Sequence, residues 1–455
     1  MIKKSLALLV VVLSIITTSF CQQIVRRPFL GAKLSTVNDS ILNIHSLKNG
    51  VKVLEITEPW CSKYHKLKSG DIIISVNNQP TTSSRELGNL IKTKRSGEAI
   101  EFKVYRNNKI RTLKGKLPAK PLETSETHDI IYDQFSFNQG QIRVIVDKPR
   151  TNKKTPAILF IQGYTCSSLD KAGDNHPYIK LVKGLCEKGY TVMRMEKPGM
   201  GDNYNTDSCN EIDFHTEVES FALALEKLKS YDFVDKENVF IWGHSMGGII
   251  APIIASQQQV KGVIVYGTTI LPWRDYIYNM LRVQPLLMDA DPVENEQNMK
   301  TYAKILYSLF IDKKNPEELS AQDTTMSKLL NEGFGYDGNG HIWTRNYKYI
   351  VQIDDYNMFD IWSRVKSNVF VFWGDADLEA FSEWDHKKIV DVVNKYNPGK
   401  ATYYNIKNTT HAFAKVESMK HGIKNRDWYY ITTHFNNQVI DESSNWIEKI
   451  VSKQK

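Results

Sequence analysis

The sequence predicts an α/β protein whose larger domain has a mostly parallel sheet and whose smaller, N-terminal domain is rich in β-structure. Beyond residue 128, continuous apolar runs alternate with stretches of helical spacing, which is the pattern of parallel strands covered by helices on both faces. Before residue 118, short strand-like runs predominate. The 455 residues, 41% of them hydrophobic, suffice for more than one core.

Residues 1–21 are typical of a secretory signal peptide. Two lysines precede an apolar stretch over 6–16, which is too short to remain as a membrane-spanning helix. Ser19 and Cys21 then occupy the small-residue positions of a cleavage site. We therefore expect a periplasmic or secreted protein whose mature chain carries no membrane span. The alternatives are a lipoprotein modified at Cys21 and an uncleaved anchor.

The composition argues against a nucleic-acid-binding protein and against a structural metal site. The formal net charge of +8 comes mainly from scattered lysines, with no dense basic block and no zinc-finger or RNA-binding motif. The sequence has no CxxC motif and no clustered Cys/His spacing. After export, four cysteines remain that can pair with one another or stay as buried thiols: Cys61, Cys166, Cys186 and Cys209.

Residues 22–118 contain the elements of a small β-rich domain. Short runs rich in β-branched residues alternate with turn signals, and only one stretch has helical spacing. The predicted elements are, in order, strands at VKVLEI (51–56) and DIIISVNNQP (71–80), a helix over 83–94, and a hairpin over 100–113 that turns at Asn107 and Asn108.

The order of these pieces resembles a PDZ domain of the bacterial-protease type. PFLGAKL (28–34) corresponds to the carboxylate-binding loop and first strand, and LKSGDIIISVNNQP (67–80) corresponds to the Gly-Asp turn and the strand after it. Such domains accept an extended peptide as an added strand. The resemblance implies that the terminal carboxylate of a peptide or protein is held by backbone N–H groups near Phe29, Leu30 and Gly31. A docking or spacer role is the alternative.

Residues 119–127 are the predicted linker, since they lie in a polar stretch, LPAKPLETSETH, that contains two prolines. The domain that follows, 128–455, alternates strands and helices. Its expected helices lie near 178–189 and 213–231, and the second has one apolar stripe. The strand-like runs are, in order, IRVIVDKP, AILFIQG, YTVMRME, VFIWG, GVIVYG, VFVFWG and ATYYNI.

Ser245 lies in a G-x-S-x-G pattern between a buried strand and a helix. The strand covers 239–242 and the helix begins at Met246. In this setting the serine sits on a tight turn, and Gly243 and Gly247 leave room for the close crossing of strand and helix. The hydroxyl then projects from the carboxyl edge of the sheet, where the helix N-terminus stabilises developing negative charge. The context predicts a nucleophile.

A serine hydroxyl needs a base that removes its proton and an acid that orients the base. Asp377 follows the strand-like run 369–374, and His411 lies in the loop after the next strand. Their order, acid before histidine, is the order that a serine nucleophile on this kind of turn requires. Asp375 is the alternative acid. Three other histidines are expected to have no catalytic role. His244 is expected to pack or to form a structural hydrogen bond, and His386 and His421 are expected to face solvent.

These motifs make residues 128–455 similar to the α/β-hydrolases, and within them to the serine-aminopeptidase-like and esterase-like branch. FIQGYTCSSLD, MRMEKPGMGDN, FIWGHSMGG, FVFWGDAD and NTTHAF occur in the expected order. The resemblance implies catalysis by Ser245, His411 and Asp377. It places the oxyanion hole at the backbone N–H groups of Met246 and Tyr164. Thr165 is the alternative donor, since QGYT departs from the commoner His-Gly sequence of this loop.

Two further features belong to the same end of the predicted fold. Cys166 and Cys209 lie in loops at the active-site end, so a disulfide between them is a hypothesis that export favours. About 95 residues, roughly 271–365, separate the strand GVIVYG from the aspartate strand and are aromatic-rich and mainly helical. An insertion of this length indicates a cap over the active site.

The sequence therefore predicts an exported serine hydrolase that cleaves carboxylic esters through an acyl-enzyme and needs no metal or organic cofactor. Peptidase action on short peptides is the runner-up, because the same three residues serve both reactions. Acyl transfer to an acceptor other than water is a further alternative. An alternative from another functional class is a binding protein that acts through its PDZ domain and whose hydrolase domain is an inactive scaffold. The expected partners are a small ester or peptide substrate and a peptide C-terminus, with no nucleic acid.

Overall fold

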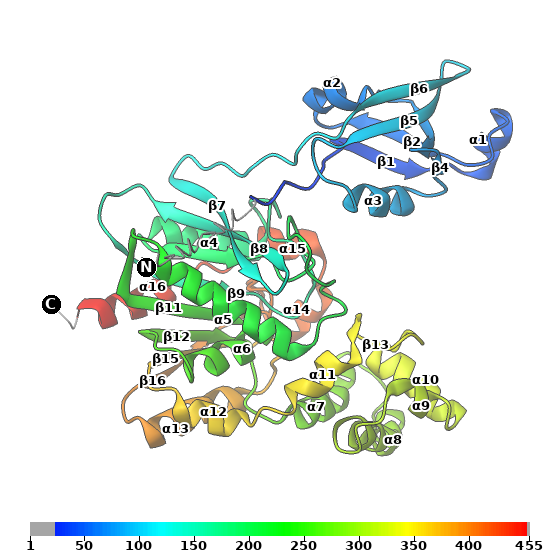
Figure 1. Cartoon of the computed structure of the whole chain (residues 1–455). Coiled ribbons are helices and arrows are strands. Elements are labelled where there is room, and N and C mark those ends of the chain that lie inside the picture. Colours follow the sequence, from blue (N-terminus) through cyan, green and yellow to red (C-terminus); the bar gives the residue numbers. More distant parts are fainter. Residues whose placement is uncertain (1–22, 453–455) are drawn as a thin grey trace, which may run out of the picture.

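The computed structural model describes residues 23–452, so the predicted signal peptide lies outside the described residues. Within this range no helix is long and apolar enough to cross a membrane. Two domains lie one above the other in Figure 1, with the N-terminal domain in blue and cyan. Their cores are separate clusters of buried apolar side chains.

The N-terminal domain is an antiparallel sheet with short helices at its edges. The strands follow the order β1-β2-β3-β5-β6, and β4 pairs with β3. Asn107 and Asn108 both have positive φ angles in the turn between β5 and β6, as a two-residue hairpin requires. The elements are β1 (Ala32–Thr36), α1 (Asp39–Ile44), β2 (Val51–Ile56), η1 (Pro59–Cys61), α2 (Ser62–His65), β3 (Ile72–Val76), β4 (Gln79–Pro80), α3 (Ser84–Lys92), β5 (Ala99–Arg106) and β6 (Lys109–Lys116).

The larger domain is built on an eight-stranded sheet with the order β16-β15-β12-β11-β9-β10-β8-β7. All neighbouring strands from β10 to β16 pair in parallel, whereas the hairpin of β7 and β8 is antiparallel. The sheet confirms the predicted mostly parallel α/β class. Its strands are β7 (His128–Phe137), β8 (Gly140–Pro149), β9 (Thr155–Ile161), β10 (Thr191–Met195), β11 (Val234–His244), β12 (Gly262–Tyr266), β15 (Asn368–Gly374) and β16 (Ala401–Ile406).

Helices cover both faces of this sheet, because its central strands, such as β9 and β12, are apolar and buried on both sides. One face packs against α4 (Pro177–Glu187) and α16 (Gln438–Ser452), through side chains such as Leu185 and Ile447. The other face packs against α5 (Phe214–Ser230), α6 (Met246–Ala255) and α13 (Glu383–Tyr396). Two short helices, α14 (Met419–Lys424) and α15 (Trp428–Thr433), follow the last strand.

A helical insertion, residues 271–365, connects β12 to β15. In Figure 1 its helices α7 to α11, coloured green to yellow, lie at the lower right of the sheet, and α12 lies beside α13. Its buried apolar side chains are continuous with the core on the α5 and α6 face. The elements are α7 (Trp273–Leu287), α8 (Pro292–Phe310), α9 (Pro316–Ser320), α10 (Thr324–Phe334), β13 (His341–Ile342), β14 (Arg345–Asn346), α11 (Tyr347–Ile353) and α12 (Met358–Arg364).

A Gly247→Ala substitution tests the close packing of α6 on the sheet. The added Cβ would lie 2.1 Å from the Ile161 carbonyl oxygen, which is backbone and cannot move without separating helix and strand. We expect the melting temperature to fall by about 5 °C or more in calorimetry.

The matched control is Gly88→Ala in α3, where a Cβ meets nothing within 4 Å. This change should raise the stability of the N-terminal domain by about 0.5–1 kcal/mol, because alanine loses less conformational entropy in a helix. Equal stability of the Gly247→Ala variant and the parent protein would contradict the packing argument.

Candidate active site

Ser245 occupies a strained turn between β11 and α6. Its φ of 55° and ψ of −119° are unusual for a residue with a side chain, and such strain persists only where the surroundings impose it. Its N–H donates to the Tyr266 carbonyl at 2.9 Å, which fixes the turn to the neighbouring strand. A Cβ on Gly243 would lie 2.2 Å from the Gly247 carbonyl oxygen, so both glycines are needed for the crossing.

Asp377 and His411 meet beyond the ends of β15 and β16. The His411 Nδ1 atom lies 2.8 Å from Asp377 Oδ2. The Asp377 side chain is fully buried, and its other oxygen accepts hydrogen bonds from the N–H groups of Glu379 and Ala380 at 2.9 and 2.7 Å. Asp375, the alternative acid, is engaged elsewhere: it accepts from the Asn408 N–H at 2.5 Å. The geometry therefore pairs His411 with Asp377.

The carboxylates around His411 favour its protonated form. Burial by itself would lower the pKa of the imidazole, but the Asp377 carboxylate and then Glu379 raise that pKa to about 9. Burial opposes ionisation of Asp377, but His411 holds the pKa of this carboxyl below its usual value. The base is therefore strongly basic and its orienting acid stays ionised.

These three side chains are also a group that could offer ligands to a metal ion. One ligand atom from each of Asp377, Glu379 and His411 lies within 4.8 Å of the others. The hydrogen bond of 2.8 Å between His411 and Asp377 occupies Nδ1 with a proton, so this nitrogen has no lone pair for a metal in that state. The arrangement fits an acid and base pair better than a ligand set.

His244 serves as a buried structural link. Its Nε2–H donates to the His411 carbonyl at 2.8 Å, and its Nδ1 accepts from the Tyr178 hydroxyl at 2.7 Å. The Gly163 N–H donates to the same tyrosine oxygen at 3.3 Å. Burial, followed by the charge of His411, lowers the pKa of His244 to about 3, so this ring is neutral. Tyr178 and His244 together thus connect the loop after β9 to the loop that carries His411. No sequence motif indicated this connection.

The expectation that His386 faces solvent was wrong. This side chain is fully buried on α13, where its Nε2 accepts from the Thr268 N–H at 3.3 Å and its Nδ1 donates to the Ser382 carbonyl at 2.8 Å. Burial lowers its pKa to about 4. The helix turns this residue inward beside Ile389, which the alternation of charged neighbours concealed. His421 is half-buried and accepts from the Glu417 N–H at 3.3 Å.

Tyr164 and Met246 lie beside Ser245 and line the same cavity. Among the described residues, neither of their backbone N–H groups has a hydrogen-bond partner, which leaves both free to donate. Thr165, the alternative donor, is exposed. A Cβ on Gly163 would lie 3.2 Å from the Ser245 Cβ, so the loop approaches the serine closely.

The cavity at Ser245 has a volume of about 480 Å³ and is mostly apolar. The helical insertion supplies most of its wall. Glu332 and Glu379 are the only charged side chains among the described residues that line it. Its aromatic and aliphatic lining includes Trp273, Tyr276, Met280, Leu281, Tyr302 and Trp343.

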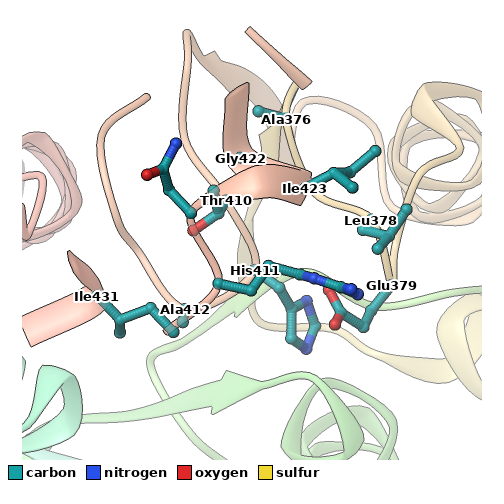
Figure 2. A pocket seen from close by; sticks show the side chains of 11 residues that line it. Ala376, Leu378, Glu379, Thr410, His411, Ala412, Gly422, Ile423 and Ile431 are labelled. Atoms are coloured by element: carbon teal, nitrogen blue, oxygen red, sulfur yellow. The ribbon is translucent and has the colours of Figure 1, made fainter. Parts of the chain in front are cut away.

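A smaller cavity of about 170 Å³ lies at His411. Figure 2 shows the His411 ring beside the Glu379 carboxylate, with Leu378, Ile423 and Thr410 around them. Arg426 also lines this cavity. Burial raises the pKa of the Glu379 carboxyl, and the charges of His411 and Arg426 partly oppose that rise. Glu379 lines both cavities, so it marks the place where they meet.

Cys166 and Cys209 form a disulfide across 43 residues of sequence. It joins the loop after β9, which carries Tyr164, to the loop before α5. Cys61 and Cys186 are free and buried, and burial raises the pKa of the Cys61 thiol to about 11. The structure therefore fixes the loop beside Ser245 covalently.

The predicted carboxylate-binding loop of the N-terminal domain is only partly free. The Phe29 N–H donates to the Pro118 carbonyl at 3.0 Å and is already occupied. Among the described residues, the N–H groups of Leu30 and Gly31 have no hydrogen-bond partner. Gly31 has a φ of 59°, and a Cβ there would lie 2.7 Å from the Cys61 sulfur. A bound carboxylate would thus meet Leu30 and Gly31 rather than Phe29.

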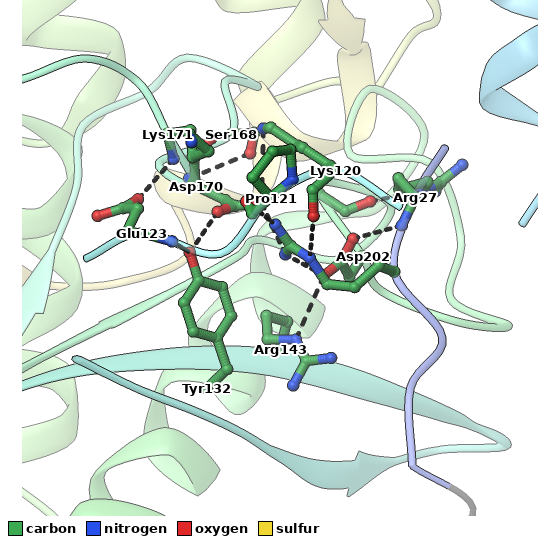
Figure 3. Close-up of polar contacts among 12 residues, drawn as sticks. Arg27, Lys120, Pro121, Glu123, Tyr132, Arg143, Ser168, Asp170, Lys171 and Asp202 are labelled. Carbon is green, nitrogen blue, oxygen red and sulfur yellow. Dashed lines mark hydrogen bonds and ion pairs between the residues drawn. The ribbon is translucent and has the colours of Figure 1, made fainter. Parts of the chain in front are cut away.

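Arginine side chains of the N-terminal domain form ion pairs and hydrogen bonds with the larger domain. Figure 3 shows Arg27 at Asp202, and the Arg27 N–H donates to that carboxylate at 2.7 Å. Arg26 contacts Asp170 at 2.8 Å, and Arg95 donates to the Asn203 carbonyl at 2.8 Å. The predicted linker is also held, because the Glu123 carboxylate forms an ion pair with Arg194 of the larger domain at 2.6 Å. The two domains are therefore packed against each other rather than loosely joined.

The comparisons with known proteins agree with these two parts. Residues 28–117 match the PDZ domain family, and residues 173–343 match the family described as serine aminopeptidase, S33. Esterase EstD of Thermotoga maritima is 25% identical over 174 residues, which are 37% of this chain and 41% of that protein. A probable periplasmic serine endoprotease DegP-like of Marinomonas sp. is 29% identical over 124 residues, which are 27% of this chain and 25% of that protein.

The chain thus spans less than half the length of these curated relatives. Among solved structures, Est1E from Butyrivibrio proteoclasticus, in a complex with ferulic acid, is 16% identical with a TM-score of 0.44, covering 71% of this chain and 98% of its own. VinJ is 15% identical with a TM-score of 0.45, covering 70% of this chain and 99% of its own. The family matches and the esterase relative support a hydrolase.

A Glu379→Gln substitution tests the electrostatics at His411. We expect kcat/KM to rise with pH as His411 loses its proton, with a midpoint above the ordinary histidine value of 6.5. Removing the Glu379 charge destabilises the protonated ring, so the midpoint should move to lower pH by on the order of one unit. The measurement is the pH profile of kcat/KM for an ester substrate.

Asp375→Asn is the matched control, since this carboxylate is held by Asn408 and Lys407 instead. It should leave the midpoint unchanged. A loss of activity in this variant, or an unshifted midpoint in Glu379→Gln, would contradict the assignment.

A thiol titration tests the disulfide. Unfolded mature protein should show two thiols, those of Cys61 and Cys186, before reduction and four after it. Replacing Cys166 and Cys209 by serine should cost about 3–4 kcal/mol of stability, because the bond closes a 43-residue loop in the unfolded chain. Four thiols before reduction would refute the pairing.

Proposed function

We propose that this hydrolase, a PDZ domain joined to an α/β-hydrolase domain, is an exported serine esterase that acts through an acyl-enzyme on Ser245. The observation that carries the proposal is the pair of Asp377 and His411, 2.8 Å apart, at the sheet edge where Ser245 stands on its strained turn. Strain at a residue that faces a cavity is characteristic of functional sites. The proposed domain boundaries are 22–118 and 128–455.

In the first step, the Nε2 of His411 accepts the proton of the Ser245 hydroxyl while Oγ attacks the ester carbonyl carbon. Asp377 holds the ring through Nδ1–H and stabilises the imidazolium without taking its proton. The carbonyl oxygen becomes an oxyanion that accepts hydrogen bonds from the N–H groups of Met246 and Tyr164. The positive end of α6 adds to this stabilisation.

The tetrahedral intermediate then collapses. The bond between the carbonyl carbon and the alkoxy oxygen breaks, and His411 gives its proton to the leaving alcohol. A water molecule attacks the acyl-enzyme, again with His411 as the base, and the carboxylic acid leaves while Ser245 recovers its proton. These steps require no metal or organic cofactor.

The shape of the site favours an ester with an apolar acyl group. The cavity of about 480 Å³ is lined by aromatic and aliphatic side chains of the helical insertion, which we propose is a cap. The smaller cavity beside His411 would take the leaving alcohol, since the protonated ring must face it. The identity to an esterase over 174 residues supports this choice.

Peptidase action on short peptides is the second candidate, and one observation favours it. Glu332 and Glu379 line the mostly apolar cavity that contains Ser245, and two carboxylates there would attract an amino group of a substrate. The match to a family described as serine aminopeptidase points the same way. The cap decides between the two reactions.

Export and peptide binding complete the proposal. The disulfide and the PDZ match to proteins called periplasmic support an oxidising compartment outside the cytoplasm. The PDZ domain would bind the C-terminus of a peptide or protein at Leu30 and Gly31. If the hydrolase domain were an inactive scaffold, this binding would be the main function.

Labelling with a fluorophosphonate tests the function most simply. Mature protein should be labelled once, and the Ser245→Ala variant should not be labelled, because only an activated serine reacts. Hydrolysis of p-nitrophenyl acyl esters should exceed that of aminoacyl-p-nitroanilides. The reverse preference would establish the peptidase. Absence of both labelling and hydrolysis in folded protein would contradict the enzyme and favour the scaffold.

A further inference from the structure

A fully buried cluster of charged side chains lies behind the loop that carries Tyr164. Lys197 follows β10, Glu217 is on α5, and Arg345 is on β14 of the helical insertion. The Lys197 ammonium lies 2.8 Å from one oxygen of Glu217, and the Arg345 guanidinium lies 2.7 Å from the other. The Arg345 guanidinium also stacks on the ring of Tyr349 at 3.7 Å. Two cations thus share a single carboxylate.

Both cations also hold the backbone of the loop. Lys197 donates to the Gly163 carbonyl at 2.6 Å, and Arg345 donates to the Tyr164 carbonyl at 3.1 Å. The peptide bond between these two residues is trans, so its C=O and its N–H point in opposite directions. Fixing the Gly163 carbonyl toward Lys197 therefore fixes the Tyr164 N–H on the opposite side of the peptide.

Ser245 is close to this loop. A Cβ on Gly163 would lie 3.2 Å from the Ser245 Cβ, and Tyr164 and Ser245 line one cavity. The N–H of Tyr164 has no hydrogen-bond partner among the residues from 23 to 452. A backbone donor that is held in place from behind and left unpaired is ready to bind a developing oxyanion.

The energetics of the cluster favour a functional role over a purely stabilising one. Burying three charges is expensive, and apolar side chains of similar size often stabilise a core equally well. The cluster has one more positive than negative charge, and its positive groups contact the carbonyl oxygens of the loop. A cation at a carbonyl polarises the peptide and strengthens the N–H as a donor. Burial lowers the pKa of Lys197 to about 8, while Lys197 and Arg345 outweigh burial and lower the pKa of Glu217.

We propose that Lys197 and Arg345, held together by Glu217, are positioning residues that aim the backbone N–H of Tyr164 into the oxyanion hole. This inference rests on the proposed serine hydrolase function. Both side chains are fully buried, and neither lines the cavity at Ser245. Their effect is on the direction and strength of a backbone donor.

Arg345 belongs to the helical insertion, so the position of the proposed oxyanion donor depends on how the insertion packs against the loop at Tyr164. The Tyr164 hydroxyl donates to the Trp343 carbonyl in the turn between β13 and β14 at 3.1 Å. The Asn346 N–H donates to the Asn210 carbonyl at 2.7 Å, next to the disulfide at Cys209. The insertion therefore contributes to the catalytic machinery as well as to the wall of the substrate cavity.

The test uses a Lys197→Met variant of the mature protein and a p-nitrophenyl ester. We expect kcat to fall on the order of 10- to 100-fold with little change in KM, because ground-state binding does not use the donor. An aryl trifluoromethyl ketone, which adds to the serine and forms a tetrahedral oxyanion, should bind more weakly by the same factor as kcat/KM falls. A purely structural role would not link these two numbers.

Two further variants complete the design. Arg345→Met removes the other cation and leaves Lys197 paired with Glu217, so no buried charge is left uncompensated and this variant carries the test if Lys197→Met does not fold. The control is Arg194→Met with Glu123→Gln, which removes another ion pair, 2.6 Å between its charged groups, that joins β10 to the segment before β7. This control should lose stability and keep kcat within about threefold.

The outcomes separate the inference from the function. If the wild-type protein hydrolyses the ester and is labelled at Ser245, an unchanged kcat in the folded Lys197→Met or Arg345→Met variant would overturn the inference alone. A variant whose kcat/KM falls while its affinity for the trifluoromethyl ketone stays unchanged would also overturn the inference. A wild-type protein that neither hydrolyses the ester nor reacts with a fluorophosphonate would overturn the proposed function, and the inference with it.

Discussion

The close crossing of α6 over the sheet is the constraint on which the site depends. At Gly243 and Gly247 the helix backbone approaches the strands so closely that no Cβ fits, and the chain between them must turn sharply. Ser245 takes up that turn with a φ of 55°, a conformation that costs about 1–3 kcal/mol and is imposed by the packed elements on either side. The loops after β15 and β16 then bring Asp377 and His411 to the same edge.

The charged side chains around this turn lie next to parts of the site where the opposite charge develops. Behind His411, a buried carboxylate at 2.8 Å favours the protonated ring that forms during attack. Behind the loop at Tyr164, two buried cations contact carbonyl oxygens at 2.6 and 3.1 Å and favour the oxyanion that forms at the same moment. The neutral ring of His244 and the hydroxyl of Tyr178 connect the two sides without adding charge. These charged groups are therefore already in place before the charges of the transition state develop.

Local patterns predicted the parts of the molecule that local physics determines. The parallel sheet followed from continuous apolar runs, and the hairpin at Asn107 and Asn108 followed from residues that tolerate positive φ. Partners that meet only in the folded chain could not be predicted in this way. Lys197 and Arg345, for example, lie far apart in sequence and share Glu217. His386 was misjudged for the same reason, because charged neighbours on its helix concealed an inward-facing position. Tertiary contacts decided each of these cases.

Rapid-quench mass spectrometry of the intact protein tests whether catalysis passes through an acyl group on Ser245. On mixing with excess p-nitrophenyl ester, we expect a burst of p-nitrophenol that matches the number of active sites. We also expect a mass increase equal to one acyl group, located on Ser245 by peptide mapping. Turnover without any adduct, or an adduct on another residue, would contradict the proposed mechanism.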